Sequence, residues 1–163
     1  PYIKTPERQK KWVYSDPIYV VKDKPLVSAD SDLKINEFAD MEGKTTCLPK
    51  SWTVPSWLKK VKEKHSVKLQ KPRSLISCLR LIKAGRVDFF VLASYLVKPA
   101  AKKEWGSFDE FRYIDFVATK TADYAIFPKS SGTAKQDAKQ LNKALKGLKD
   151  SGAYQKLWDK HLK

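Results

Sequence analysis

Residues 43–94 alternate regularly between apolar runs and stretches with helical spacing, and this alternation limits the fold more than any other feature. The successive segments are 45–49, 51–65, 67–70, 74–85 and 86–94. In the fourth segment Leu75, Leu79 and Ile82 recur at helical intervals, and Gly85 follows as a stop signal. Strand, helix, strand, helix, strand in this order is typical of a parallel sheet covered by helices. We therefore expect an α/β fold.

The sequence on either side of this region predicts further elements. We expect helices or helical turns at 6–12, 35–44, 134–152 and 153–162, and extended segments at 16–29, 112–119 and 124–128. The helix within 51–65 is expected to begin early, with Ser51 or Thr53 as its cap and Pro55 in its first turn.

The net charge of +15 comes from lysine rather than arginine, since 28 of the 33 basic residues are lysine. Phosphate neutralisation dominates nucleic-acid affinity, but base and phosphate recognition favours the forked guanidinium of arginine. The lysines are also spread from Lys4 to Lys163. A solvated basic surface is therefore the favoured interpretation, and no specific nucleic-acid partner is expected.

The apolar content of 42% is typical of a globular protein. The longest apolar run, residues 89–97, is far shorter than the roughly 20 residues that a membrane-spanning helix needs. We therefore expect a soluble chain. No export signal is visible, but such signals are removed on maturation, so the sequence is compatible with a periplasmic location.

Residues that would hold a metal are scarce. Cys47 and Cys78 lack the spacing of a zinc site, and His65 and His161 lie among lysines without a ligand cluster. The two cysteines are either separate buried residues or, in an oxidising compartment, a disulfide. We expect no metal and no cofactor.

Catalytic patterns are also missing, since no phosphate-binding glycine loop, nucleophilic serine motif or paired-histidine helix occurs. Four acids cluster in sequence: Glu104, Asp109, Glu110 and Asp115. Acids around a loop are usually just solvated, so a catalytic pair is the minority interpretation. We expect a binding protein rather than an enzyme.

Six short motifs follow one another along nearly the whole chain. They are TPER at 5–8, SDPIY at 15–19, KSWT at 50–53, AGRVD at 84–88, YAIFPK at 124–129 and NKALKGLKDSGAYQKLW at 142–158. In this order and spacing they resemble the type II periplasmic solute-binding proteins, the substrate-binding family of polar amino acid ABC transporters. Each motif alone is weak, but the series is fairly specific. The resemblance implies a periplasmic-binding-protein-like type II α/β fold.

The resemblance also implies a domain organisation. Residues 1–20 and 120–163 match part of lobe one, and residues 21–119 match a complete three-layer lobe two. The N-terminal part of lobe one has no counterpart in this sequence. Either the chain is a processed or trimmed fragment, or it is a short relative that completes its sheet with a partner, as a homodimer or a swapped dimer.

The resemblance implies a ligand site with residues from both lobes. Arg8 matches the arginine of a T-x-x-R motif and is expected to bind a carboxylate, with Thr5 adding a hydroxyl or backbone contact. Ser51 matches a small turn at a helix start and is either a ligand contact or only a helix cap. Trp52 stands where a small hydroxyl residue is usual, and either stacks on the ligand or fills the cleft. Tyr14 lies near the hinge, where packing is favoured over stacking on the ligand.

One departure from the family pattern bears on the ligand. Members that bind amino acids commonly present an aspartate after the strand that follows G-R-x-D, where it pairs with the ligand's ammonium. In this chain that position falls at about Ala93, whereas Asp88 belongs to the turn and is expected to act as a structural acceptor. The sequence therefore favours capture of an anion over recognition of a free amino group.

The implied function is capture of a small carboxylate or amino-acid-like solute between two lobes. The resemblance also implies that the solute is delivered to a membrane permease of an ABC-type uptake system. Its implied location is the periplasm or another extracytoplasmic space. A sensory ligand-binding domain of the same fold is the alternative. A basic nucleic-acid-binding module is a further alternative from a different class.

Overall fold

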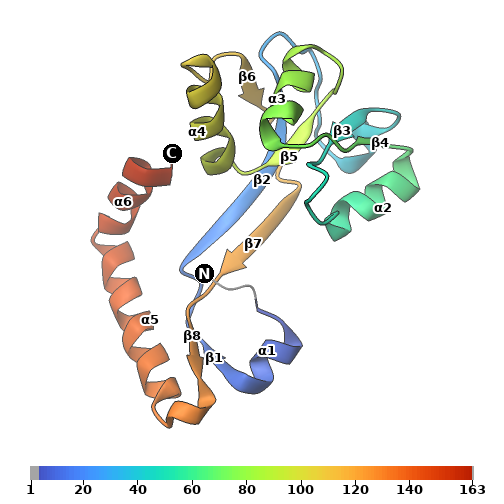
Figure 1. The fold of residues 1–163 in the computed structure, drawn as a ribbon. Coiled ribbons are helices and arrows are strands. Elements are labelled where there is room, and N and C mark those ends of the chain that lie inside the picture. The colour runs from blue at the N-terminus through green and yellow to red at the C-terminus, as the bar shows by residue number, and fades with distance from the viewer. Residues whose placement is uncertain (1–3, 163) are drawn as a thin grey trace. The chain divides into compact units, whose positions relative to one another are not determined.

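The computed structural model describes residues 4–162, which form two compact units (Figure 1). Unit 1 contains residues 1–21 and 120–163, and unit 2 contains residues 22–119. The chain crosses from one unit to the other twice, within strand β2 (Tyr19–Ser28) and strand β7 (Thr119–Asp123). These two strands pair with each other.

Unit 2 holds most of the strands and three of the longer helices. Its remaining elements are η1 (Phe38–Met41), β3 (Thr45–Cys47), α2 (Ser56–His65), β4 (Lys68–Gln70), α3 (Leu75–Lys83), β5 (Phe90–Leu92), α4 (Ser94–Trp105) and β6 (Phe111–Tyr113). The helix predicted in 74–85 is confirmed, and Gly85 follows it with a φ of 65°.

The central strands of unit 2 are buried on both faces. Strand β2 lies between β5 and β6 and runs antiparallel to both. Leu26 and Phe90 enter a hydrophobic core shared with α3 and α4. Val27 and Val91, one residue further along each strand, enter a second core shared with α2 and η1. Unit 2 is therefore a three-layer α/β structure with helices on both faces of its strands.

The parallel arrangement predicted for residues 43–94 is confirmed. Strands β3 and β4 pair in parallel, and Thr46 forms a parallel bridge to Phe89, just before β5. The buried Thr46 hydroxyl donates to the carbonyl of Phe89 at 3.0 Å, which ties β3 to the start of β5. The antiparallel strand β2 comes from outside this segment.

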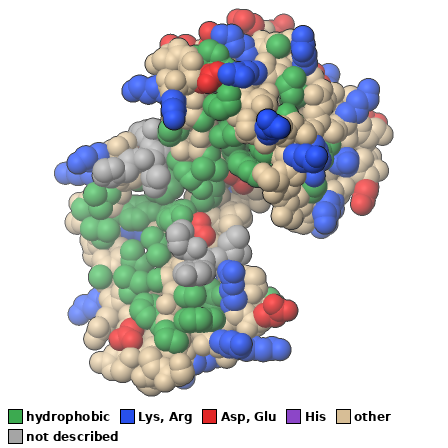
Figure 2. Space-filling model, in the orientation of Figure 1, with side chains coloured by type: hydrophobic (Ala, Val, Ile, Leu, Met, Phe, Trp, Pro, Cys, Tyr) green, Lys and Arg blue, Asp and Glu red, His purple; other side chains and the backbone are tan. Residues whose placement is uncertain are grey.

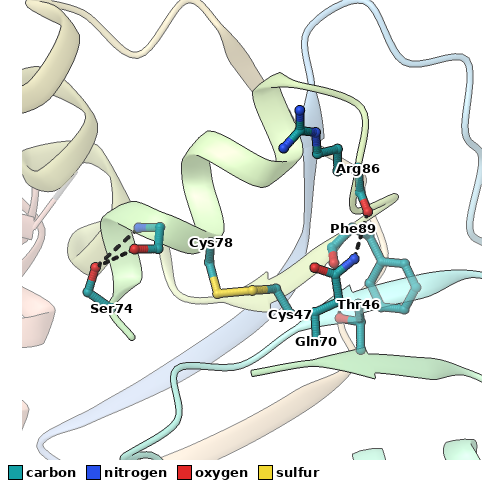
Figure 3. Close-up of a disulfide and its surroundings, with 8 residues drawn as sticks. Thr46, Cys47, Gln70, Ser74, Cys78, Arg86 and Phe89 are labelled. Atoms are coloured by element: carbon teal, nitrogen blue, oxygen red, sulfur yellow. Dashed lines mark hydrogen bonds between the residues drawn. A yellow bond between two sulfur atoms is a disulfide. The ribbon is translucent and has the colours of Figure 1, made fainter. Parts of the chain in front are cut away.

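A disulfide joins Cys47, at the end of β3, to Cys78 in α3, with 5.8 Å between the Cα atoms (Figure 3). Both cysteines are buried in the core that contains Leu26 and Phe90. The sequence left the state of the two cysteines open, and the structure shows them joined.

The helix predicted within 51–65 begins later than expected. Residue Pro55 takes the N-cap position of α2 with a ψ of 153°, and the first helical residue is Ser56. A proline disfavours helical backbone at the residue before it, so Val54 cannot extend the helix toward the N-terminus. The predicted caps, Ser51 and Thr53, are therefore wrong.

The single strand predicted at 112–119 is also wrong. Strand β6 ends at Tyr113, and β7 begins only at Thr119. Between them the Phe116 N–H donates to the Ile114 carbonyl at 2.8 Å, which marks a tight turn.

Unit 1 is built around a long helix and a two-stranded antiparallel sheet. Its elements are α1 (Pro6–Lys11), β1 (Trp12–Tyr14), β8 (Ile126–Pro128), η2 (Lys129–Ser131), α5 (Ala134–Asp150) and α6 (Ala153–Leu162). Strand β1 pairs with β8, and α5 packs against both through a face that contains the buried Ala134 and Ala138. None of the described helices combines the length and apolar character needed to cross a membrane.

Candidate functional site

Thr5 and Arg8 lie at the start of unit 1, beside and on the short helix α1. The Thr5 hydroxyl accepts a hydrogen bond from the Arg8 backbone N–H at 3.3 Å and so caps the helix. Pro6 occupies the first turn, where its missing N–H costs nothing. The Arg8 side chain is exposed to solvent. The T-x-x-R spacing thus has a local reason, since the threonine caps the helix that carries the arginine.

Tyr14 lies in β1 and packs among other side chains of unit 1. Its ring meets that of Tyr124 edge-on, with 5.6 Å between the centroids. The Lys4 ammonium lies over both rings, 5.6 Å and 5.8 Å from their centroids. The Tyr14 hydroxyl is buried and has no hydrogen-bond partner among the residues that the structure describes.

Ser51 and Trp52 lie in unit 2, in the connection between β3 and α2. The Trp52 N–H donates to the Pro49 carbonyl at 2.9 Å, which closes a turn around the exposed Ser51. Trp52 is partly buried and contacts Phe90 at a centroid distance of 6.4 Å, on the edge of the core. Because α2 begins only at Ser56, the N–H groups at the start of that helix are not next to Ser51.

Asp23, which the sequence analysis did not single out, lies against Ala93. Strand β2 pairs with β5 through Lys24 and Leu92, and the next residues along each strand are Asp23 and Ala93. The Asp23 carboxylate accepts a hydrogen bond from the Ala93 backbone N–H. Burial raises the pKa of Asp23, and the hydrogen bond from Ala93 offsets only part of this effect. Asp23, from a different segment of the chain, therefore places a carboxyl group next to Ala93.

Tyr113, on β6, has a buried hydroxyl in the same unit. No hydrogen-bond partner for this hydroxyl occurs among residues 4–162. Burial raises the pKa of Tyr113 well above its usual value, and the nearby charge of Asp23 raises it further. The Tyr113 ring stacks on Phe108 at a centroid distance of 5.9 Å, which fixes the position of the ring.

The acidic cluster noted in the sequence is divided among separate surface ion pairs. Three of its acids pair with basic side chains, as Arg80 with Glu104, Lys83 with Glu110 and Lys24 with Asp115. Asp88 accepts a hydrogen bond from the Thr45 backbone N–H at 2.6 Å, which agrees with its expected structural role. Within the described part of the chain, no group of three histidine, cysteine or acidic side chains could hold a metal ion. The side chain of His161 lies outside that part.

The basic side chains do not gather into one patch on the face shown in Figure 2, where lysines and arginines are scattered over both units among apolar and acidic residues. The groove beside α5, about 670 Å³ in volume, combines several lysines with Asp16 and Asp150. In this groove Lys146 pairs with Asp150. This scattered distribution of charge agrees with a solvated basic surface.

The predicted site residues thus belong to both units. Thr5, Arg8 and Tyr14 lie in unit 1, whereas Ser51 and Trp52 lie in unit 2. Asp23 was missed because it stands between two lysines in an extended segment, which is typical of a solvated position. The only signal that reveals it is the pairing of β2 with β5, and that pairing joins segments far apart in the sequence.

Several solved structures share this fold. The second substrate-binding domain of a putative amino acid ABC transporter from Streptococcus pneumoniae is 19% identical, with a TM-score of 0.78, and the match covers 99% of this chain and 70% of that one. A probable amino-acid ABC transporter extracellular-binding protein from Bacillus subtilis is 22% identical, with a TM-score of 0.76, covering 99% and 68%. The L-cystine solute receptor of Neisseria gonorrhoeae is 21% identical, with a TM-score of 0.75, covering 98% and 63%.

The chain therefore spans about two thirds of the length of these structures, and their likeness shows a type II periplasmic-binding-protein fold. Comparison with curated protein sequences gives no match. A family model, by contrast, matches residues 1–163. The α/β units and this match lead to one conclusion: the chain belongs to the bacterial extracellular solute-binding proteins, family 3.

Proposed function

We propose that this chain is the solute-capturing part of an ABC-type uptake system and binds a small carboxylate or amino-acid-like solute between two lobes. The observation that carries the proposal is the division into two compact units joined by β2 and β7. Two separately packed units on a pair of connecting strands can close around a ligand by small changes in backbone angle at the connection. Membership of an extracellular solute-binding family supports a role in transport outside the cytoplasm.

In this proposal unit 1 is part of lobe one and unit 2 is lobe two. Each lobe offers groups that suit a small polar solute. Arg8, exposed on α1, offers a planar guanidinium whose two parallel N–H groups match the geometry of a carboxylate. Thr5 supports it by capping α1, so its role is to position Arg8. Ser51 offers an exposed hydroxyl, and Trp52 a partly exposed ring, on unit 2. Tyr14 helps to pack unit 1 around the β1 strand.

The solute is expected to pass to a membrane permease, in the periplasm or another extracytoplasmic space. Such proteins are generally not enzymes, and delivery requires binding and release without chemical change. We propose a homodimer or a swapped dimer as the form in which the protein associates. An uptake assay in cells that carry the matching permease distinguishes transport from a purely sensory role. If the protein serves transport, cells that lack it should no longer accumulate the solute, whereas loss of a sensory protein should leave uptake by the permease intact.

The experiment that tests binding is isothermal titration of the full-length protein with individual L-amino acids and small carboxylic acids. Arg8→Ala should weaken the affinity for the bound solute by about 1.5–3 kcal/mol, as expected for a hydrogen bond to a charged group. Arg8→Lys keeps the positive charge but loses the two parallel N–H groups of the guanidinium, so its affinity for the solute should lie between those of the wild type and Arg8→Ala. Lys10→Gln, on the same exposed helix, is the matched control and should bind normally.

Two results would contradict the proposal. If no amino acid or carboxylate binds to the wild-type protein, capture of such solutes is excluded. If the solute binds to Arg8→Ala as tightly as to the wild type, Arg8 does not belong to the site.

A further inference from the structure

We infer that Asn142 and Tyr154, on the C-terminal helices α5 and α6, are positioning residues that hold the 15–18 segment in place. By holding it, they confine bending between the two units to residues 19–22 and 119–122, the connecting ribbon. This inference rests on the proposed function and adds residues that control solute affinity without touching the solute. Neither residue is among the ligand contacts that the sequence predicts.

The 15–18 segment leads from β1 into β2. Three consecutive residues of this segment are each hydrogen-bonded to one side chain of the C-terminal helices. The three bonds join the Asp16 N–H to Asn142 Oδ1 at 2.7 Å, Lys149 Nζ to the Pro17 carbonyl at 3.1 Å, and the Tyr154 hydroxyl to the Ile18 carbonyl at 2.8 Å. Asp16 and Pro17 lie outside both strands, so the helices supply hydrogen bonds that a strand ladder would otherwise supply.

Aromatic contacts extend this clamp to the first residue of β2. The Tyr154 ring stacks on Trp158 at a centroid distance of 6.4 Å, and Trp158 contacts Tyr19 at 5.9 Å. The Lys149 ammonium lies over the Tyr154 ring, 5.4 Å from its centroid. The side chains that hold the 15–18 segment therefore also hold one another.

Two backbone hydrogen bonds mark the ends of the connecting ribbon. In unit 1 the Ile18 N–H donates to the Asp123 carbonyl at 2.8 Å. In unit 2 the Ala118 N–H donates to the Asp23 carbonyl at 3.0 Å. The ribbon is the part of β2 and β7 that lies between these two bonds.

The connecting ribbon is less supported than the units on either side of it. Its residues of β2 precede the pairing with β5, which starts at Lys24, and the pairing with β6, which starts at Leu26. Val20, within the ribbon, is 42% exposed. Two strands without further strands or a packed core are only marginally stable. Bending is therefore expected in the ribbon, provided that the 15–18 segment stays with unit 1.

Confinement of the bending links the clamp to solute affinity. A protein that samples fewer arrangements of its two units when empty loses less conformational entropy when the solute binds. Release of the 15–18 segment adds arrangements, and the affinity falls with the fraction of molecules that are competent to bind. The loss is limited by the net contribution of the hydrogen bond removed, which corresponds to about 2–10-fold in affinity for each bond.

Two variants remove one hydrogen bond each. Tyr154→Phe keeps the aromatic ring and loses only the hydroxyl. Asn142→Leu removes the acceptor oxygen, whereas Asn142→Asp keeps an oxygen at that place and should restore the bond. Lys146→Gln is the matched control, because Lys146 lies on the same helix and pairs with Asp150 rather than with the 15–18 segment.

The first readout is local and needs no solute. Hydrogen exchange of the Asp16 amide is followed by NMR in the full-length protein. It should be faster in Asn142→Leu than in the wild type, because the acceptor of this N–H is lost. Exchange should return toward the wild-type rate in Asn142→Asp and stay at that rate in Lys146→Gln.

The second readout is the distribution of distances between two nitroxide labels, measured by double electron–electron resonance on the empty protein. The labels are attached to Lys62→Cys on α2 and Lys135→Cys on α5, two exposed positions in different units. The native disulfide between Cys47 and Cys78 is buried and does not react with the label. Asn142→Leu and Tyr154→Phe should each broaden the distribution.

The third readout is isothermal titration with the amino acid that binds most tightly in a screen of the twenty L-amino acids. Asn142→Leu and Tyr154→Phe should each bind it about 2–10-fold more weakly than the wild type. Asn142→Asp and Lys146→Gln should resemble the wild type in the distance distribution and in affinity. A merely structural role would lower thermal stability and leave both quantities unchanged at a temperature where all variants are folded.

The outcomes separate the clamp from the proposed function. If Asn142→Leu and Tyr154→Phe leave the distance distribution or the affinity unchanged, the positioning role is overturned while solute capture stands. Equal effects in Lys146→Gln would assign the change to α5 in general and would also overturn it. A broadened distribution in variants of a protein that binds no amino acid or carboxylic acid supports the clamp and removes the proposed function.

Discussion

The disulfide between Cys47 and Cys78 should supply a large share of the stability of unit 2. It joins the end of β3 to α3, and the loop that it closes contains α2 and β4. Closing a loop restricts the unfolded chain and leaves the folded chain unchanged. For the observed separation of 31 residues, the loop-entropy relation gives about 3.7 kcal/mol at 25 °C. A single small domain is typically stable by about 5–15 kcal/mol, so reduction should remove a substantial fraction of this free energy.

The assay is urea unfolding of the oxidised and the reduced wild-type protein, followed by tryptophan fluorescence. Because the two units are compact and separate, their transitions need not coincide. Replacing Trp12 and Trp158 with phenylalanine leaves tryptophans only in unit 2, namely Trp52, Trp57 and Trp105. The signal then reports on the unit that contains the disulfide.

The oxidised form should be more stable than the reduced form by about 3.7 kcal/mol. The Cys47→Ala/Cys78→Ala variant is the control, and its unfolding should not respond to the reductant. A difference below about 1 kcal/mol between the oxidised and reduced proteins would refute the argument from loop entropy. An equal effect of the reductant on the alanine variant would show that the effect does not come from this bond.

Three further substitutions in unit 2 test how the structure assigns stability. Asp23→Asn should stabilise unit 2 at neutral pH, because the pKa of Asp23 in the folded protein lies above its unfolded value of 3.8 and the charged carboxylate therefore destabilises the fold. The contribution of Asp23 to stability is lost as the pH rises from the unfolded pKa through the folded pKa. In thermal unfolding near pH 3, the stability gained by Asp23→Asn should therefore vanish. Ser74→Ala should lower the free energy of unfolding in urea by about 1 kcal/mol, because the Ser74 hydroxyl caps α3 by accepting a hydrogen bond from the Ser77 N–H at 3.2 Å. Ser74→Asn should restore most of this free energy, because asparagine is also a good cap. Phe89→Ala should lower the free energy of unfolding by about 3–5 kcal/mol, because this side chain is fully buried in the core shared with α2. A loss below about 1 kcal/mol would contradict the burial of Phe89 in this core.

The local elements of this protein are strongly encoded in its sequence. Helix α3 follows its apolar spacing and stops at Gly85, and α5 follows its amphipathic pattern to Gly152. The predicted start of α2 lies too early because the prediction placed Pro55 in the first turn but overlooked that a proline disfavours helical backbone at the preceding Val54. This local rule excludes Val54 from the helix and would have placed the start at Pro55 or later.

The non-local features could not be predicted in the same way. The pairing of β2 with β5 and β6 joins residues more than sixty positions apart, and no local pattern specifies it. The disulfide and the contact of Asp23 with Ala93 depend on such long-range pairing, so the sequence left the first open and missed the second. Thr5 and Arg8 belong to a local motif that includes its own helix cap, and their role in ligand binding stays a prediction.

The measurement that tests solute capture most directly is native mass spectrometry of the full-length protein after exposure to an equimolar mixture of the twenty L-amino acids. The account predicts one added mass per chain, equal to that of a single amino acid, whose share of the signal falls in Arg8→Ala. The same spectrum reports whether the protein is a monomer or a dimer. Bare protein in the wild-type spectrum, with no amino acid retained at any concentration of the mixture, would contradict the account.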